Sequence, residues 1–444
     1  MVTQLAPADA AVDLDEAALR AFAVSLRGAL IRPHDAGYDE ARAVWNAMID
    51  RRPALVVRCA GVADVVAALA FARAAVADGA LVVDLSPMKG IRAVRVEGGA
   101  TWAELDHETQ AVGLATTSGK VWATGVGGLT LGGGLGWLMR AHGLACDNLL
   151  SADVVTADGR FLTAGPTAHA DLFWGLRGGG GNFGVVTSFE FRLHEVGPTL
   201  IAGPLFHPLA AAHEALRFYR DVAPTLPEAL ICHAALLTSP DGARLAALLP
   251  AYVGPTAAGE AAVAALRAFG PPAVDLVGPM PYHALQTIFD AAFPAGRRNY
   301  WKSGFLPGLE DAAIDLLVEG FARAPSPSAT VLVEQLGGAV GRVGADATAF
   351  PHRSAPYNVV ILSAWDDPAG DAANVAWARD LWTALRPFLA GGVYVNYLGD
   401  ADAEGEDRVR AAYGPNHGRL AALKGAYDPA NRFRSNQNIA PMAP

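Results

Sequence analysis

Two glycine-rich stretches contain the residues whose types and spacing most clearly suggest chemistry. Seven glycines lie between Gly125 and Gly136, and four more, Gly178 to Gly181, directly precede Asn182. Glycine at this density costs conformational entropy, and it is used where a backbone turns sharply or closely approaches another group. Bare N–H groups along such loops can hold a phosphate or the polar edge of a ring. From the glycines alone, a ligand cradle and a set of ligand-free tight turns both remain open.

The second stretch also has the spacing of a dinucleotide-binding fingerprint. Gly179, Gly181 and Gly184 satisfy G-x-G-x-x-G, but that fingerprint requires a helix directly after the glycines. Residues 185–193 read VVTSFEFRL, with polar and apolar residues alternating from Ser188 onward. This period of two predicts a strand. The sequence therefore argues against a Rossmann fold and favours a different glycine-rich site.

Composition excludes several classes of function. The chain has 444 residues, of which 52% are hydrophobic and 18% charged, with a net charge of −10. This length allows two or three domains, and the acidic balance disfavours a nucleic-acid binder. No apolar run is long enough for a membrane span, and the first residues do not resemble a secretory signal. The spacings of Cys59, Cys146 and Cys232, and of the histidines, suggest neither disulfides nor a metal site, so we expect a cytoplasmic protein without a metal.

The elements that position these stretches follow from periodicity. In the first part we predict helices at 13–31, 64–77, 101–112, 135–142 and 171–176, and strands at 55–57, 81–85, 94–97, 150–156 and 161–163. Thr101 and Glu104 form a capping-box pattern, and Asp158-Gly159 predicts a hairpin turn. In the second part, strand-like runs at 230–237, 301–305, 330–335 and 358–364 alternate with helical runs at 211–220, 260–269, 282–289, 311–322 and 374–385. In the tail, Leu420, Leu423 and Tyr427 share one helix face, and Pro429 ends that helix.

Taken in order, these pieces resemble the berberine-bridge-enzyme-like oxidoreductases, flavin enzymes with a PCMH-type (vanillyl-alcohol-oxidase-type) FAD domain. The resemblance covers residues 38–439, and its most specific pieces are TGVGGLTLGGGLGWL, CDNLLSADVVTADGR, RGGGGNFGVVTSFEFRLH, YVNY and YDPANRFRSNQNI. It implies an α+β fold in three parts. These are an FAD-binding domain at 1–198, a substrate domain with a helix-covered, mostly antiparallel sheet at 199–390, and a C-terminal segment at 391–444 that returns to the FAD domain.

The resemblance also implies a function. An FAD-dependent oxidase would transfer a hydride from a C–H bond of a small alcohol, sugar or secondary-metabolite intermediate to flavin, and then to O₂. Tyr394 and Asn396 match the family's Y-x-N motif, in which the Tyr is a candidate base and the Asn helps to hold the site; Tyr397 is a second candidate base. A tyrosine has an unperturbed pKa of about 10 and needs help from its surroundings to act as a base. Glu334-Gln335 and His352-Arg353 lie where the family places polar groups on the substrate side.

The resemblance implies the following FAD-binding residues. Those along the pyrophosphate and flavin would be Gly125, Val126, Gly127, Gly128, Leu129, Thr130, Gly133 and Gly136. Those beside the adenosine half would be Asp153, Val155, Gly181, Asn182, Gly184, Val185 and Val186. From the tail, Asn436 and Asn438 would touch the flavin. Asp147 and Asn148 either lie near FAD or form only a turn and a cap.

The chain departs from the family in one region. Family members carry a parallel strand after the helix predicted at 64–77, followed by a glycine-rich loop whose His is bonded to the flavin. Here Asp78-Gly79 leads directly into LVVDLS, no Gly-Gly-Gly-His sequence occurs, and Val121 replaces the second linking residue, a Cys. We therefore expect non-covalent FAD and two open sheet edges. Two alternatives are a flavin-free relative acting as a cyclase, isomerase or binding protein, and a defective gene product.

Overall fold

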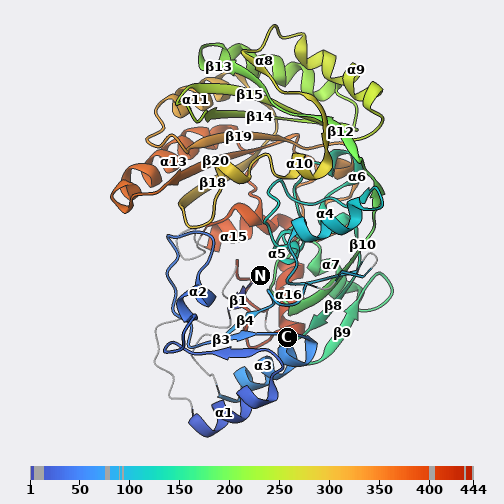
Figure 1. Cartoon of the computed structure of the whole chain (residues 1–444), viewed down its shortest axis with the longest axis vertical. Coiled ribbons are helices and arrows are strands. Elements are labelled where there is room, and N and C mark those ends of the chain that lie inside the picture. Colours follow the sequence, from blue (N-terminus) through green and yellow to red (C-terminus); the bar gives the residue numbers. More distant parts are fainter. Residues whose placement is uncertain are drawn as a thin grey trace.

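The structure, a computed structural model, describes residues 2–4, 15–75, 81–89, 91–92, 95–399, 406–434 and 437–442. Figure 1 shows two halves along the long axis, with the largest sheet and its helices in the upper half and smaller sheets in the lower half. Helices and mostly antiparallel sheets confirm the predicted α+β class. No helix among these residues is long and apolar enough to cross a membrane.

A four-stranded sheet in the order β1-β4-β3-β2 lies at the lower end. Its strands are β1 (Val2–Gln4), β2 (Ala29–Ile31), β3 (Leu55–Arg58) and β4 (Leu81–Asp84), and its helices are α1 (Glu16–Ser25), α2 (Tyr38–Arg42) and α3 (Val62–Ala75). β4 pairs with β3 in parallel and with β1 antiparallel. The two open edges expected beside a missing central strand do not form, because β4 pairs directly with β3; the edge strands of this sheet are β1 and β2. The end of the helix predicted at 64–77 lies outside the described residues.

The helix predicted at 13–31 was too long. In the described residues it is α1 followed by the strand β2. The Asp64 carboxylate accepts hydrogen bonds from the N–H groups of Arg27 and Gly28, each at 2.9 Å, which fixes the chain after α1. A Cβ on Gly28 would lie 1.8 Å from the Arg58 carbonyl oxygen, so glycine allows β2 to approach β3.

A second sheet, ordered β5-β6-β10-β8-β9, supports the glycine-rich stretches. Its strands are β5 (Ile91–Arg92), β6 (Arg95–Glu97), β8 (Leu149–Val155), β9 (Phe161–Ala164) and β10 (Val185–Phe191), with α4 (Trp102–Gln110) and α7 (Ala170–Leu176) beside it; β7 (Leu114–Ala115) pairs with β11 (His194–Glu195). The strand after the glycine run, the β8–β9 hairpin and the capping box of α4 are all confirmed. The prediction at 135–142 was only partly right. The last turn forms α6 (Met139–His142), and a helix not predicted, α5 (Val126–Leu131), lies inside the glycines.

The upper half is a nine-stranded antiparallel sheet. Its strands are β12 (Thr199–Ala202), β13 (Leu205–Pro208), β14 (Leu230–Thr238), β15 (Arg244–Tyr252), β16 (Val274–Asp275), β17 (Gly278–Pro281), β18 (Arg298–Leu306), β19 (Thr330–Gln335) and β20 (Tyr357–Trp365). The helices α8 (Ala212–Val222), α9 (Thr256–Arg267), α11 (Asp311–Ala322) and α13 (Asp371–Leu385) cover one face, as Figure 1 shows. The short helix α10 (Tyr282–Gln286) lies on the other side, toward the lower half, as Figure 1 shows. The short helix α12 (Ala339–Arg342) contacts α6.

The tail returns to the lower half through α15 (Glu406–Tyr413) and α16 (His417–Tyr427) (Figure 1). Leu420 and Leu423 of α16 pack in the same apolar cluster as Phe183 and Phe189, beside the second glycine run. Because the large sheet starts at Thr199 and the tail contacts the first part, we propose the domain boundaries 1–198, 199–390 and 391–444.

Candidate active site

A row of polar side chains crosses the sheet face that looks toward the lower half. Glu334 pairs with Asn358 across β19 and β20, and β14 places His233 at the same level. Alternation along each strand puts these side chains opposite the helix-covered face. All three are fully buried. The row lies where the two halves meet.

Glu334 is the centre of a hydrogen-bonded group drawn from both halves. Its carboxylate accepts hydrogen bonds from the Tyr397 hydroxyl at 2.8 Å and the Asn358 amide at 2.6 Å, and it forms an ion pair with Lys120. Burial, followed by the charge of Glu334, raises the pKa of Tyr397 well above its usual value. In this arrangement the phenol keeps its proton and directs it at a carboxylate.

Tyr394 has different surroundings. Its phenol oxygen accepts hydrogen bonds from the Gly134 N–H at 2.9 Å, the Leu135 N–H at 3.3 Å and the Asn396 amide at 2.8 Å. Burial raises the pKa of Tyr394, and these three donors oppose that shift. Asn396 also donates to the Leu129 carbonyl at 3.1 Å. The structure thus brings the Y-x-N motif onto the first glycine stretch.

The two glycine-rich stretches meet each other. The Leu131 carbonyl accepts hydrogen bonds from the N–H groups of Gly178, at 3.0 Å, and Gly180, at 2.9 Å. Gly133 has a φ of +123°, and a Cβ there would lie 2.9 Å from the Phe350 ring. A Cβ on Gly136 would lie 1.9 Å from the Ser118 carbonyl oxygen. Both positions therefore require glycine for internal packing.

Other glycines in the first stretch have open space beside them. A Cβ on Gly125 or on Gly128 would have no heavy atom of the described residues within 4 Å. The nearby Thr130 hydroxyl is buried without a hydrogen-bond partner among the described residues, and Asn396 is exposed. The first stretch thus combines packed glycines with glycines that face open space. Val126 and Gly127 are buried inside the short helix α5.

The predicted residue Asn182 holds the tail. Its amide donates to the Gly179 carbonyl at 2.9 Å and to the Gln437 carbonyl at 3.3 Å, and its side-chain oxygen accepts from the Ile439 N–H at 3.1 Å. Asn438 is half-buried, and its side-chain oxygen has no hydrogen-bond partner within the part of the chain that the structure describes. Asn436 lies outside the described residues.

The residues predicted for the adenosine half lie on β8, β10 and the turn before β10. The Asp153 carboxylate accepts hydrogen bonds from Ser188 and Thr163, each at 2.7 Å, and pairs with Arg95. The others are backbone neighbours in this sheet or its entry turn, and all of them are buried: Val155, Gly181, Gly184, Val185 and Val186.

Other predicted polar groups make internal contacts. Asp147 forms a two-fold ion pair with Arg353, at 2.7 and 2.8 Å. The Asn148 amide donates to the carbonyls of His142 and Leu144, as the turn-and-cap interpretation predicts. His352 contacts the Ala412 carbonyl. Gln335 bonds the backbone of Cys232 and Ala223, so of the four substrate-side groups only Glu334 belongs to the row.

Sequence reasoning missed several residues of the site. Lys120 and Asn358 were not singled out, and neither was the aromatic series in which Trp301 touches both Phe293 and Tyr397, with ring centroids 6.1 and 5.9 Å apart. Alternation along residues 358–364 could have placed Asn358 on the face of Glu334. No local signal links Lys120 to a residue 214 positions away.

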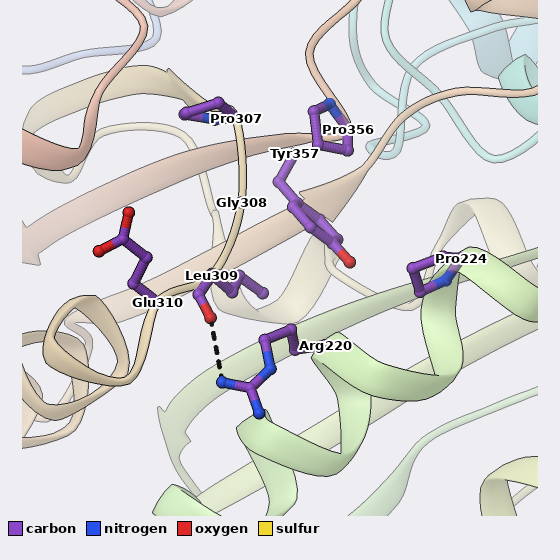
Figure 2. A pocket seen from close by; sticks show the side chains of 8 residues that line it. All are labelled: Arg220, Pro224, Pro307, Gly308, Leu309, Glu310, Pro356 and Tyr357. Carbon is purple, nitrogen blue, oxygen red and sulfur yellow. Dashed lines mark hydrogen bonds between the residues drawn. The ribbon is translucent and has the colours of Figure 1, made fainter.

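A cavity of about 440 Å³ lies elsewhere, among residues that include Arg220, Pro307 and Tyr357 (Figure 2). Tyr357 belongs to the helix-covered core, so this cavity is on the opposite face of the sheet. Its Arg220 is engaged with Asp311 and with the Leu309 carbonyl. None of the predicted site residues lines it.

Comparison with known proteins identifies the family. Residues 73–165 match the FAD binding domain model, and residues 393–440 match the berberine and berberine-like model. An FAD-linked oxidoreductase of Dictyostelium discoideum is 31% identical over 447 residues, covering 95% of this chain and 96% of that protein. The chain belongs to the berberine-bridge-enzyme-like FAD-linked oxidoreductases. Within this family, (R)-6-hydroxynicotine oxidase of Paenarthrobacter nicotinovorans is 30% identical over 456 residues, with 94% of this chain and 98% of that protein covered. The crystal structure of 6-hydroxy-D-nicotine oxidase from Arthrobacter nicotinovorans superposes with a TM-score of 0.85 at 27% identity, covering 94% and 99% of the two chains.

The residues present fit the family's cofactor, FAD. Considering the described residues, the open space beside Gly125 and Gly128 and the Thr130 hydroxyl without a partner lie in the same stretch, which the tail motif contacts through Asn396. Backbone free of side chains is what a phosphate or flavin edge requires. Membership in an FAD-linked family favours the flavoprotein over the flavin-free alternative.

Proposed function

We propose that the chain is an oxidase that holds FAD without a covalent bond and oxidises a small alcohol, sugar or secondary-metabolite intermediate. When bound, FAD would supply the redox chemistry, taking a hydride from a substrate carbon and passing two electrons to O₂. For an alcohol the balance is R₂CHOH + O₂ → R₂C=O + H₂O₂. The observation that carries the proposal is the hydrogen bond from Tyr397 to the buried Glu334, beside the motif that contacts the first glycine stretch.

Removing a hydride from an alcohol carbon also requires that its hydroxyl loses a proton. We propose that the Tyr397 phenol oxygen accepts the substrate hydroxyl proton. At the same time the proton of Tyr397 moves to the Glu334 carboxylate. Positioned proton transfer of this kind contributes about 10²- to 10⁴-fold in rate. Tyr394 and Asn396 hold the segment in place through the glycine stretch.

Two observations support a non-covalent flavin. The chain contains no Gly-Gly-Gly-His sequence, and the family resemblance places Val121 at the position of the second linking residue. Cys146, which donates its backbone N–H to Gly133, is fully buried, and burial raises the pKa of its thiol. A thiol held in its neutral form is a poor nucleophile.

All three cysteines are unpaired, which supports the proposed cytoplasmic location.

Absorbance of the purified protein tests the proposal. After incubation with FAD and desalting, flavin bands should remain with the protein, and acid precipitation should release them into the supernatant. Flavin that stays in the precipitate would contradict non-covalent binding. Alcohols and sugars are then assayed for H₂O₂ formed per substrate consumed. Substrate oxidation that reduces only an artificial acceptor would identify a dehydrogenase instead.

A further inference from the structure

A buried ion pair joins the two halves at the candidate site. Lys120, just before the first glycine stretch, pairs with Glu334 on the large sheet. The Lys120 side chain is 6% exposed and that of Glu334 is 0% exposed. The other side-chain bonds of this carboxylate come from neutral donors, Tyr397 and Asn358.

Among the described residues around Glu334, Lys120 is the cation that pairs with its carboxylate. Across the sheet, burial and then the charge of Lys120 lower the pKa of His233 well below its usual value, so its imidazole is neutral. Burial raises the pKa values of the phenols of Tyr394 and Tyr397 and, on the helix-covered side of the sheet, of Tyr219 on α8. The Arg140 guanidinium on α6 donates its hydrogen bonds to the backbone carbonyls of residues 226, 230 and 336 rather than to Glu334.

A buried carboxylate without a countercharge takes up a proton at much higher pH than one beside a cation. We propose that Lys120 is a positioning residue, which keeps Glu334 charged and oriented and so sets the pH above which the Tyr397–Glu334 pair accepts the substrate proton. This inference rests on the proposed function. Lys120 itself exchanges no proton with the substrate.

The test compares Lys120→Met and Lys120→Arg with the wild-type protein, with Lys89→Met as a matched control. Lys89 forms a 2.6 Å pair with Glu104 that is partly exposed, so its loss should change nothing. In Lys120→Met the acidic limb of the pH profile of kcat/KM should move upward by about one to three pH units. Lys120→Arg should restore the wild-type limb. An unmoved limb in Lys120→Met would overturn the inference.

A second measurement does not depend on flavin or turnover. In Lys120→Met the folded protein binds the Glu334 proton more tightly than the unfolded chain, so its stability should fall relative to wild type as pH rises from 5 to 8. Adding Glu334→Gln should remove this pH dependence. If Tm follows this pattern but no substrate is oxidised, the proposed function fails while the role of Lys120 stands. If the Tm difference is the same at every pH, Lys120 does not control the charge of Glu334.

Discussion

Two tyrosines of one short motif have opposite hydrogen-bonding roles. The Tyr394 oxygen receives three N–H groups, two of them from the backbone of the glycine stretch. The Tyr397 hydroxyl donates a hydrogen bond to a buried carboxylate. A phenol that already shares its proton with a carboxylate can accept another one, whereas a phenol surrounded by donors is an anchor. The spacing of the motif alone does not distinguish these roles.

Replacing Tyr394 and Tyr397 one at a time with phenylalanine should distinguish the anchoring role from the proton-accepting role. Tyr397→Phe should lower kcat by about 10²- to 10⁴-fold while FAD content is unchanged. Tyr394→Phe leaves buried donors unpaired, and we expect it to lower the free energy of unfolding by about 1–3 kcal/mol and to weaken FAD retention. Steady-state kinetics, flavin content and denaturant unfolding would be measured for both. A larger loss of kcat in Tyr394→Phe, with FAD retained, would reverse the assignment.

Asp106 is a buried acid whose protonation should be visible in stability. One of its oxygens accepts from the Gln286 amide at 3.0 Å, and the other is unpartnered among the described residues. Burial raises the pKa of Asp106 to about 7. Folding therefore favours the protonated form, and stability falls as pH rises from about 4, the unfolded value, to about 7.

Asp106→Asn removes this titration. The unfolding free energy of the variant minus that of the wild-type protein should increase by on the order of 2–4 kcal/mol from pH 5 to pH 8. Urea unfolding at several pH values measures it. A difference between variant and wild type that does not change with pH would show that Asp106 titrates alike in the folded and unfolded chains.

At the level of helices and strands, local patterns succeeded where local chemistry decides the structure. The capping box at Thr101 and the Asp158-Gly159 hairpin formed as predicted. The strand β15 was missed because its residues, RLAALLPAY, are rich in helix formers, and pairing with β14 along its whole length overrides that preference. Likewise α5 is a helix despite its glycines, since Val126 and Leu131 are buried in the core.

Two glycines of the first stretch should respond differently to alanine. Gly128→Ala meets open space within a helix, so the free energy of unfolding without FAD should stay the same or rise by about 1 kcal/mol. FAD affinity should nevertheless fall, because the new methyl group occupies the cradle. Gly136→Ala would clash with the Ser118 carbonyl and should destabilise the protein with or without FAD. Unchanged FAD affinity in Gly128→Ala would place the cofactor elsewhere.

The candidate site was predictable only in part. Motifs pointed to the glycine stretches and the Y-x-N residues, which are local sequence features, and the family resemblance pointed to Glu334. Lys120 joins the site through a fold-level contact between distant segments, which no spacing reveals. The same holds for Arg353, whose ion pair with Asp147 gives a predicted polar residue a structural role.

At the scale of the whole molecule, buried polar contacts hold the C-terminal tail against the second glycine run. Lys424 is fully buried, and its ammonium group donates to the Asn182 carbonyl at 2.8 Å, the Asp428 carboxylate at 2.6 Å and the Phe433 carbonyl at 2.9 Å. One cation thus ties the second glycine run to the turn after α16. Asn182 adds bonds to residues 437 and 439.

Lys424→Met should weaken the attachment of the tail to the second glycine run. It leaves the buried Asp428 without its cation, which costs about 3–5 kcal/mol of unfolding free energy. We expect a lower Tm and faster loss of FAD. Arg323→Met, which removes an exposed pair with Glu319, should leave both unchanged. Wild-type Tm in Lys424→Met would show that the tail is held by its apolar contacts alone.

The clamp between Asn182 and the tail also fixes an order of events during protein synthesis. The strands of the large sheet are complete once Trp365 has been made, so that half can fold while translation continues. The hydrogen bond of Asn182 with Ile439, in contrast, joins residues 257 positions apart and forms only once the tail has been made. The cofactor cradle can therefore be completed only after the large sheet and the tail have both been synthesised, and we expect FAD to bind only to a chain that already includes the tail.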